Sequence, residues 1–460
     1  MMELKGKKVL VVGLGKSGLA AALFLRRQGA QVTVSDVRSA EALAKEIPAL
    51  IEEGIMVETG GHGLLTFRRQ DLIVVSPGVP LDTPELAQVK SFGLPVIGEL
   101  ELAGRFLKGK ILAVTGSNGK TTTTTLLGEI LAAGGLPTLV GGNIGVPVVS
   151  LIDSSTDESW SVLEVSSFQL ETTDEFHPAI AVILNITPDH MDRHGSFENY
   201  ALAKERIFAA QNERDCLVLN ADNARAAEAA SRSAATVYWF SVEHPVAQGA
   251  WLEQGNVVYR PAPDAATEVV MPLRGIPLKG SHNVENVLAA VTAARLAGAP
   301  AGAVRQAIES FQAVEHRLEY VATHNGVDFY NDSKATNVDA TAKAIAAFDS
   351  GIHLILGGKD KGSDYTQLAT LLRARVRAVY TIGAAAAKIE SQLRGVVSIE
   401  SCETLDNAVV AAASAARPGE VVLLAPACSS FDQFESYEHR GRAFKKLVSE
   451  HRGWKLWQNS

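Results

Sequence analysis

Short apolar runs alternate along the chain with longer stretches in which apolar residues recur at helical spacing. Examples are KKVLVVGLG, ILAVTG, AVILNIT, IHLILGG and VVLLAPA, which are apolar nearly throughout and end in glycine or polar residues. Strands of this kind are typical of parallel sheets that helices cover on both faces. Their alternation with helices predicts an α/β fold.

This strand–helix pattern restarts twice along the 460 residues. The first block ends in a helix that gives way to Lys108-Gly109-Lys110 before a new strand. The second restart follows a predicted helix at 301–311, after which two short strands should meet at Asn325-Gly326. We therefore expect three domains, at residues 1–105, 106–313 and 314–460, each large enough for its own core.

The stretch TGSNGKTT resembles a phosphate-binding loop, although Val114 stands where the usual G-x-x-x-x-G-K-[ST] pattern has its first glycine. Backbone N–H groups of such a loop surround phosphate oxygens, and the following helix N-terminus adds partial positive charge. The lysine would reach the β and γ phosphates, and one of the first two threonines would bind Mg²⁺. The alternative is a tight turn with an exposed lysine. The residues expected at the phosphates are Gly116, Ser117, Asn118, Gly119, Lys120, Thr121 and Thr122.

Acidic and histidine residues follow this loop. Glu164 lies within or at the end of an apolar strand, where a carboxylate is costly unless it is paired or binds a metal. The segment DHMDRH includes Asp189 and His190, and the sequence alone leaves open which histidine is a ligand or whether the loop is simply solvated. Lys204, in ALAKERIF, has the pattern of a lysine on a helix surface.

The N-terminal stretch VVGLGKSGLAA matches G-x-G-x-x-G at Gly13, Gly15 and Gly18, and Asp36 ends the next strand. This is the dinucleotide-binding pattern between a strand and a helix. Alone it suggests a nicotinamide- or flavin-dependent oxidoreductase, but a sugar nucleotide diphosphate fits the same loop. A second nucleotide loop downstream favours the second interpretation, because hydride transfer needs no ATP.

Composition narrows the class of protein. A net charge of −8 argues against broad nucleic-acid binding. The cysteines Cys216, Cys402 and Cys428 form no C-x-x-C pair, so neither a disulfide framework nor a zinc knuckle is indicated. The N-terminus lacks a signal-peptide pattern, and no run of about 18 apolar residues occurs. We expect a cytoplasmic protein with no membrane span and, for want of heptad repeats, a monomer.

The two nucleotide-type loops and the third α/β domain together resemble the Mur ligases of peptidoglycan synthesis over essentially the whole chain. Within that family, YNDSKATN and LLAPACSSFDQFESYEHRG are similar to the member that adds D-glutamate to UDP-N-acetylmuramoyl-L-alanine. Folylpolyglutamate synthetase is similar in the last two domains but lacks the first. The resemblance implies a Rossmann-like N-terminal domain, a central P-loop ATPase-type domain with a parallel sheet, and a Rossmann-like C-terminal domain.

The resemblance also implies roles for individual residues. The uridine diphosphate part of the substrate would contact Ser17, Asp36, Arg38 and Gly78. ATP would contact residues 116–122 together with Asn283, Arg317, Asp332 and Lys334. The magnesium ligands would be Thr121, Glu164, His190 and a carbamylated Lys204, with His190 and Asn143 also close to the substrate. The D-glutamate pocket would consist of Thr336, Lys359, Ser430 and Tyr437.

The implied chemistry explains these residue types. A carboxylate is a poor electrophile, so ATP would convert it to an acyl phosphate that the amine of D-glutamate attacks. Phosphoryl transfer depends mainly on positioning and charge neutralisation, which Lys120, Arg317 and magnesium would supply alongside Glu164, His190 and Lys204. Closure of the third domain on ligand binding would exclude water. The alternatives are another Mur-type amino-acid ligase, a nicotinamide-dependent oxidoreductase, and a non-catalytic nucleotide sensor.

Overall fold

The computed structural model describes residues 2–312 and 314–450, so the domain boundary predicted at residue 313 lies outside the described residues. The chain forms two compact units. Unit 1 comprises the described residues up to Ile186 together with Glu198–Gly275 and Asn286–Glu309. Unit 2 comprises Thr187–Phe197, Ile276–Glu285 and the described residues from Ser310 onward.

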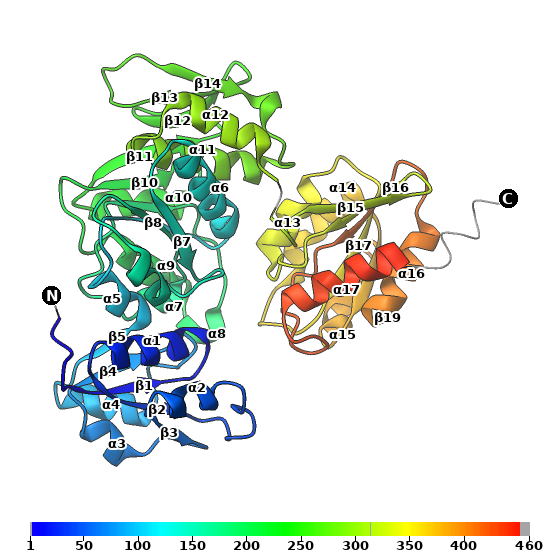
Figure 1. Cartoon of the computed structure of the whole chain (residues 1–460). Helices are drawn as coiled ribbons and strands as arrows, with labels where there is room; N and C mark the ends of the chain where they lie inside the picture. The colour runs from blue at the N-terminus through cyan, green and yellow to red at the C-terminus, as the bar shows by residue number, and fades with distance from the viewer. Residues whose placement is uncertain (1, 313, 451–460) are drawn as a thin grey trace. The chain divides into compact units, whose positions relative to one another are not determined.

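The N-terminal part of unit 1 is a parallel sheet with the strand order β3-β2-β1-β4-β5 (Figure 1, blue). Its strands are β1 (Lys8–Val12), β2 (Gln31–Asp36), β3 (Met56–Thr59), β4 (Leu72–Val75) and β5 (Val96–Gly98). Its helices are α1 (Lys16–Arg27), α2 (Ile47–Glu52), α3 (Leu64–Arg68), α4 (Pro84–Ser91) and α5 (Glu99–Gly104). The central strand β1 runs into the first glycine loop, so this loop lies at the carboxyl edge of the sheet.

The rest of unit 1 is built on a second sheet with the order β14-β13-β12-β11-β10-β9-β6-β8-β7. The parallel strands are β6 (Lys110–Thr115), β7 (Thr138–Gly142), β8 (Trp160–Glu164), β9 (Ile180–Ile183), β10 (Cys216–Asn220), β11 (Thr236–Ser241) and β12 (Gly249–Glu253). Helices and 3-10 turns along this part are α6 (Lys120–Ala133), η1 (Val148–Ser154), α7 (Ser167–Leu170), α9 (Phe197–Glu205), η2 (Arg206–Phe208), α10 (Ala224–Ala227), η3 (Glu228–Arg232), η4 (Leu273–Gly275), α11 (Ser281–Leu296) and α12 (Ala301–Ser310). Strand β6 lies between β8 and β9, so the ends of these three strands meet beside the phosphate loop.

One end of this sheet departs from the predicted parallel pattern. Strands β12, β13 (Asn256–Arg260) and β14 (Glu268–Pro272) pair antiparallel. The β12–β13 turn places Gln254 and Gly255 at φ values of 49° and 75°, which is the left-handed backbone of a two-residue hairpin. The sequence analysis did not identify this hairpin.

Unit 2 contains the third sheet, with the order β15-β16-β20-β17-β18-β19. Its strands are β15 (Glu319–His324), β16 (Val327–Asn331), β17 (Ile352–Gly357), β18 (Val376–Ile382), β19 (Ser398–Glu403) and β20 (Val421–Leu424). Its helices and turns are α8 (Met191–His194), α13 (Val338–Ala346), η5 (Tyr365–Leu368), α14 (Ala369–Arg375), α15 (Ala386–Gln392), α16 (Leu405–Ala415) and α17 (Tyr437–Glu450). The hairpin predicted at Asn325-Gly326 is confirmed, with φ values of 52° and 75°.

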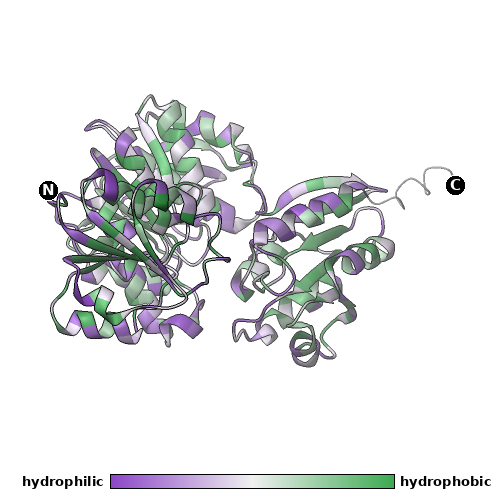
Figure 2. Ribbon diagram, turned by 60° about the horizontal axis from the view of Figure 1, so that its bottom comes forward, coloured by the Kyte–Doolittle hydropathy of each residue, from purple (hydrophilic) through white to green (hydrophobic). Residues whose placement is uncertain are grey.

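The strands predicted from apolar runs are buried strands of these sheets. Figure 2 shows the sheet strands mostly in the hydrophobic colour, with hydrophilic residues on the surrounding helices. Helices cover the two faces of the third sheet, where the apolar residues form two separate clusters. Among the described residues, we find no helix with the length and hydropathy needed to cross a bilayer.

Candidate functional site

The phosphate loop connects the end of β6 to the first turn of α6. Gly119 precedes the helix with φ 87°, a backbone conformation that side-chain-bearing residues rarely adopt. A side chain at this position would also collide with the side chain of Asn286. The second glycine of the predicted motif is therefore required both by its backbone and by its packing.

The loop is held by its own lysine and by an asparagine from the next strand. Lys120 Nζ donates to the carbonyl oxygens of Gly116 at 2.8 Å and Ser117 at 2.9 Å, so its ammonium group lies over the loop. The Asn118 amide donates to Asn185 Oδ1 at 2.9 Å, and Asn185 Nδ2 donates back to the Asn118 carbonyl at 3.1 Å. Sequence reasoning missed Asn185, although its place just after β9, at the carboxyl edge of a parallel sheet, was a usable signal.

Glu164 joins the loop to two other predicted residues. It is the last residue of β8 and its side chain is fully buried. Its Oε2 accepts a hydrogen bond from Thr121 Oγ1 at 2.7 Å, and its Oε1 accepts one from Asn143 Nδ2 at 2.8 Å. This contact favours Thr121 over Thr122 as the magnesium-binding threonine. A carboxylate and a hydroxyl at the phosphate loop are the oxygen donors that suit Mg²⁺.

Lys204 is not a surface lysine, so the prediction made from the helix pattern alone is wrong. Its side chain is 1% exposed, and its Nζ donates to the Gly116 carbonyl at 2.9 Å. It also lies 4.6 Å from the centre of the Tyr200 ring, whose hydroxyl is 3.0 Å from Ser117 Oγ. Tyr200 precedes Lys204 by four residues on α9, and this helical spacing was a usable signal.

The first glycine loop contacts the predicted residues Asp36 and Arg38. Arg38 Nη2 lies 2.9 Å from Asp36 Oδ2, and the Leu14 amide donates to the same oxygen at 2.7 Å. Burial alone would raise the pKa of Asp36, but hydrogen bonds from Arg38 and Leu14 outweigh it and hold the pKa at about 2. A side chain at Gly18 would collide with the Gly13 carbonyl oxygen, so helix α1 approaches the loop as the motif predicts.

The other two predicted uridine contacts are Ser17 and Gly78. Ser17 is on α1 and is partly buried, and Gly78 is exposed in the loop after β4. Of the four residues, Asp36 and Arg38 contact each other at the carboxyl edge of the first sheet. The uridine-binding roles of all four residues stay predictions.

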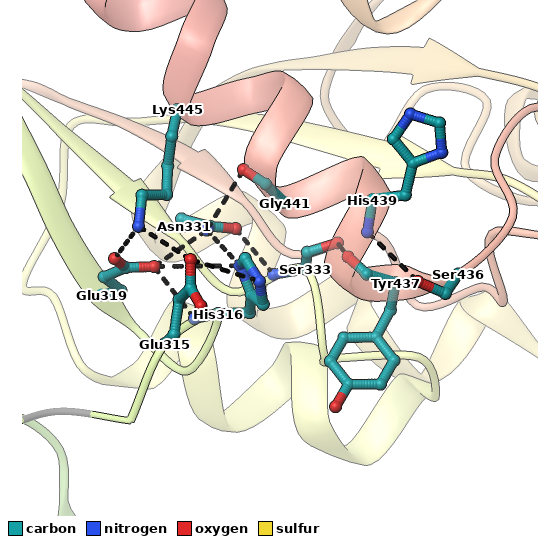
Figure 3. Close-up of polar contacts among 10 residues, drawn as sticks. All are labelled: Glu315, His316, Glu319, Asn331, Ser333, Ser436, Tyr437, His439, Gly441 and Lys445. Atoms are coloured by element: carbon teal, nitrogen blue, oxygen red, sulfur yellow. Dashed lines mark hydrogen bonds and ion pairs between the residues drawn. The ribbon is translucent and has the colours of Figure 1, made fainter. Parts of the chain in front are cut away.

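In unit 2, a network of polar contacts connects the segments that carry Arg317, Lys334 and Tyr437 (Figure 3). The His316 amide donates to Glu319 Oε2 at 2.9 Å, and the Lys334 amide donates to the His316 carbonyl at 3.2 Å. Lys334 Nζ in turn donates to the Tyr437 hydroxyl at 2.8 Å. The three predicted residues therefore share one supporting network.

His316 is the buried centre of this network. It has a left-handed backbone with φ 67°, and a side chain at Gly441 would collide with its ring. Burial lowers the pKa of His316, so the ring is neutral near pH 7. Lys445 Nζ binds Glu319 Oε1 at 2.6 Å on the outer side of the same network.

Other predicted residues of unit 2 are placed as follows. His190 directly precedes α8 and has φ 55°, and the Asn283 side chain donates to the Lys279 carbonyl at 2.7 Å. Loss of hydration raises the pKa of Asp332 to about 7, although the Arg317 guanidinium acts in the opposite direction. His190 and Asn283 belong to unit 2, and their proposed roles at the nucleotide stay predictions.

The predicted D-glutamate residues lie in loops at the carboxyl ends of strands in the third sheet or at the start of α17. Ser430 is 2% exposed, Thr336 is partly buried, and Lys359 is exposed. Lys361, which sequence reasoning missed, is 18% exposed and lies 3.5 Å from Asp189 Oδ1. It is a second candidate cation for this pocket.

Arg440 is a further residue that the sequence analysis did not identify. It is 1% exposed, and its Nη2 donates to the carbonyls of Ser333 at 2.8 Å and Cys428 at 3.1 Å. Its Nε donates to Ser333 Oγ at 3.0 Å. This buried guanidinium therefore joins helix α17 to two of the loops with predicted ligands.

Comparison with known proteins covers all three predicted domains. The family models that match are "Mur ligase MurD-like, N-terminal domain" at residues 7–98, "Mur ligase middle domain" at 114–294 and "Mur ligase, glutamate ligase domain" at 316–428. A UDP-N-acetylmuramoylalanine–D-glutamate ligase of Acidobacterium capsulatum is 70% identical over 459 residues and covers 100% of both chains. The corresponding ligase of Koribacter versatilis is 60% identical and covers 97% of this chain and 98% of its own.

Solved structures with a similar fold are more distant in sequence. A MurF ligase from Thermotoga maritima in complex with ADP is 16% identical, with a TM-score of 0.61 over 98% of this chain and 100% of that chain. A pseudomurein peptide ligase type C from Methanothermus fervidus is 19% identical, with a TM-score of 0.60 over 97% and 100%. These likenesses confirm the predicted three-part α/β architecture.

Proposed function

Because the chain belongs to the Mur ligase family, we propose that it is the ATP-dependent ligase that joins D-glutamate to UDP-N-acetylmuramoyl-L-alanine. The observation that carries this proposal is the 70% identity, along the full chain, to a ligase of that name. The phosphate loop with its buried Glu164 supplies a matching site in this chain.

Activation of the substrate carboxylate requires a loop that neutralises phosphate charge. Lys120 is already positioned over the loop by two backbone carbonyls, and a bound phosphate would offer it a stronger, charged partner. Glu164 and Thr121 would hold Mg²⁺, which would neutralise charge on the phosphates. Arg317, supported by the network around His316, would add a further positive charge.

The nucleotide part of the first substrate and the amino acid each need a binding site. For the uridine diphosphate, we propose the first glycine loop with Ser17, Asp36, Arg38 and Gly78, because the pair Asp36–Arg38 lies beside this loop at the carboxyl edge of the first sheet. For D-glutamate, we propose a pocket whose cations bind the two carboxylates and whose hydroxyls fix their orientation. Its residues are Thr336, Lys359 or Lys361, Ser430 and Tyr437.

We propose that Lys204 is carbamylated. Its neutral amine would attack CO₂, forming a nitrogen–carbon bond and releasing a proton, and the resulting carboxylate would join Glu164 among the oxygen donors. Its burial beside Gly116 supports a role in the site. Lys204→Ala should lose activity and regain it with added short carboxylates, whereas full activity of the variant without additives would refute the modification.

A cytoplasmic location and a monomeric state stay predictions.

The test is phosphate release from ATP with UDP-N-acetylmuramoyl-L-alanine and a panel of amino acids. We expect release that needs both the nucleotide sugar and D-glutamate, and none with L-glutamate. The Lys120→Ala variant should lose about 10³-fold in turnover while folding normally. Lys110→Ala, an exposed lysine at the opposite end of β6, is the matched control and should keep its activity. Release with another amino acid instead would contradict the assignment of D-glutamate.

A further inference from the structure

A series of side-chain contacts connects the two segments that carry residues predicted to bind D-glutamate. Tyr365, at the start of η5, is fully buried. Its hydroxyl donates to Asp360 Oδ1 at 2.8 Å and lies 2.9 Å from Cys428 Sγ. Lys388 Nζ donates to the other oxygen of Asp360 at 2.8 Å. Four side chains from three segments of the sequence thus form one continuous connection.

The protonation states of the side chains determine which atom donates in each hydrogen bond. Burial would raise the pKa of Asp360, but hydrogen bonds from Lys388 and Tyr365 lower it below its usual range, so the group is ionised and only accepts. The single hydroxyl hydrogen of Tyr365 goes to Asp360, and the tyrosine oxygen must therefore accept from the Cys428 thiol. Burial raises the pKa of this thiol to about 11, so its proton is present at neutral pH.

These side-chain contacts connect the segment that contains Lys359 and Lys361 with the segment that contains Ser430. The backbones of these segments are already paired, since the Lys359 amide donates to the Ser429 carbonyl at 2.8 Å and the Ser429 amide donates back at 3.1 Å. The Ser429 hydroxyl also donates to the Lys359 carbonyl at 3.0 Å. The contact of Asp360 and Cys428 through Tyr365 adds a further connection that uses buried side chains, so the two segments are fixed relative to each other at more than one point.

The inward position of Asp360 also orients the residues on either side of it. Asp360 is directed toward buried Tyr365, whereas its neighbour Lys359 is exposed and its neighbour Lys361 pairs with Asp189. A lysine has a flexible four-carbon stem, so a fixed backbone reduces the entropy lost when it binds a carboxylate.

We propose that Tyr365 and Asp360 are positioning residues of the amino-acid site, which hold Lys359 and Lys361 in place relative to Ser430. The inference rests on the proposed function, because the assignment of D-glutamate to this pocket gives the network its ligand. Tyr365 and Asp360 act through the lysines rather than on the substrate. Loss of the connection should therefore weaken D-glutamate binding without changing the handling of ATP.

The sharpest variant is Tyr365→Phe, which removes only the bridging hydroxyl. A hydrogen bond to a charged group supports an expected rise in KM for D-glutamate of about tenfold, with KM for ATP changed by less than about twofold. Tyr380→Phe is the matched control, because Tyr380 is another buried tyrosine of unit 2, and its hydroxyl lies 3.0 Å from His353 Nδ1. Both variants should lower Tm to a similar extent, and only Tyr365→Phe should raise KM for D-glutamate.

Variants of the thiol provide a second measurement. Cys428→Ser keeps a small donor toward Tyr365 and should retain a KM for D-glutamate near that of the wild type, whereas Cys428→Ala should raise it. If Tyr365→Phe does not fold, Asp360→Ala carries the test, because this residue lies in a partly exposed loop and makes both of the charged contacts. It should raise KM for D-glutamate by at least the same factor.

A Tyr365→Phe enzyme with an unchanged KM for D-glutamate, or an equal rise in Tyr380→Phe, would overturn the positioning role while leaving the ligase assignment intact. A wild-type enzyme that shows no phosphate release dependent on D-glutamate would overturn both. The two failures are therefore distinguished by the wild-type assay, which is performed first.

Discussion

Two carboxyl groups of unit 1 show how the surroundings of a single residue decide its charge. Asp36 is 4% exposed, yet its hydrogen bonds from Arg38 and Leu14 keep its pKa at about 2. Glu99 is 1% exposed, and burial raises its pKa from 4.5 to about 7, although the Val149 amide donates to its Oε1 at 2.7 Å. Among the described residues, Glu99 Oε2 has no hydrogen-bond partner.

Glu99 should make the stability of the protein depend on pH. The native carboxyl holds its proton up to about pH 7 while the unfolded one loses it near pH 4.5, so the native state binds more protons in this window. The free energy of unfolding should therefore fall as pH rises through the window, by about 3 kcal/mol in total. Urea unfolding across this range should show a flatter dependence for Glu99→Gln. Glu52→Gln, an exposed control, should keep the wild-type slope, and an unchanged slope in Glu99→Gln would contradict the assignment.

Two lysines compete for the same predicted role at the D-glutamate pocket. Lys359 was predicted from sequence, and Lys361 is the less exposed of the two. Because a charged hydrogen bond to a carboxylate contributes strongly to binding, removal of the ligand lysine should raise KM for D-glutamate by at least about tenfold. Lys359→Ala and Lys361→Ala, measured side by side, identify which lysine binds the substrate. Equally small effects on KM in both variants would show that neither lysine binds D-glutamate.

At the scale of elements, the start of α6 is where local sequence and function agree most closely. Gly119 needs a left-handed backbone and has the Asn286 side chain against it. Gly135, just after the same helix, also has a positive φ of 75° but meets nothing within 4 Å. The two glycines therefore share the backbone requirement and differ in packing.

This difference gives a matched pair of variants. Gly135→Ala should cost about 1–2 kcal/mol of stability from backbone strain and leave KM for ATP unchanged. Gly119→Ala carries the same strain and also displaces Asn286 or the loop, so KM for ATP should rise by about tenfold or more. Tm and steady-state kinetics on both variants check this, and an unchanged KM for ATP in Gly119→Ala would show that the loop adapts.

At the scale of the whole molecule, the first two sheets belong to one unit, and a buried carboxylate connects them. Glu101 of α5 is fully buried and accepts hydrogen bonds from the amides of Asp174 at 2.8 Å and Phe176 at 3.0 Å, with Glu175 between them. Arg105 Nε donates to it at 2.7 Å. Helix α5 follows the last strand of the first sheet and is thereby bound to a loop of the second.

Removal of the Glu101 charge should weaken this connection between the two sheets. Glu101→Gln leaves Arg105 with a neutral partner and removes one acceptor oxygen from the amides, so the free energy of unfolding should fall by about 3 kcal/mol. Unfolding should also separate into more steps, because the two sheets lose a buried connection between them. Calorimetry would detect both effects, with exposed Glu158→Gln as the control. A change below about 0.5 kcal/mol would refute the role.

The sequence by itself determined the strand–helix alternation, both glycine loops and the hairpin at Asn325-Gly326, because these depend on local periodicity and on backbone conformations that few residues adopt. The resemblance to the Mur ligases supplied the candidate ligands, since single positions such as Lys204 have no local signature of their role. The helix pattern alone predicts a surface position for Lys204, whereas in the structure Lys204 is buried and contacts Gly116 of the phosphate loop.

Tertiary structure decided what depends on residues far apart in sequence. It brought Glu164 to Thr121, drew Asp360 inward against Tyr365 and Cys428, and buried Arg440 between two loops. It also raised the pKa of Glu99. Burial and the pairing of distant groups follow from packing, which no local pattern records, and they set both the charges and the positions on which the proposed chemistry depends.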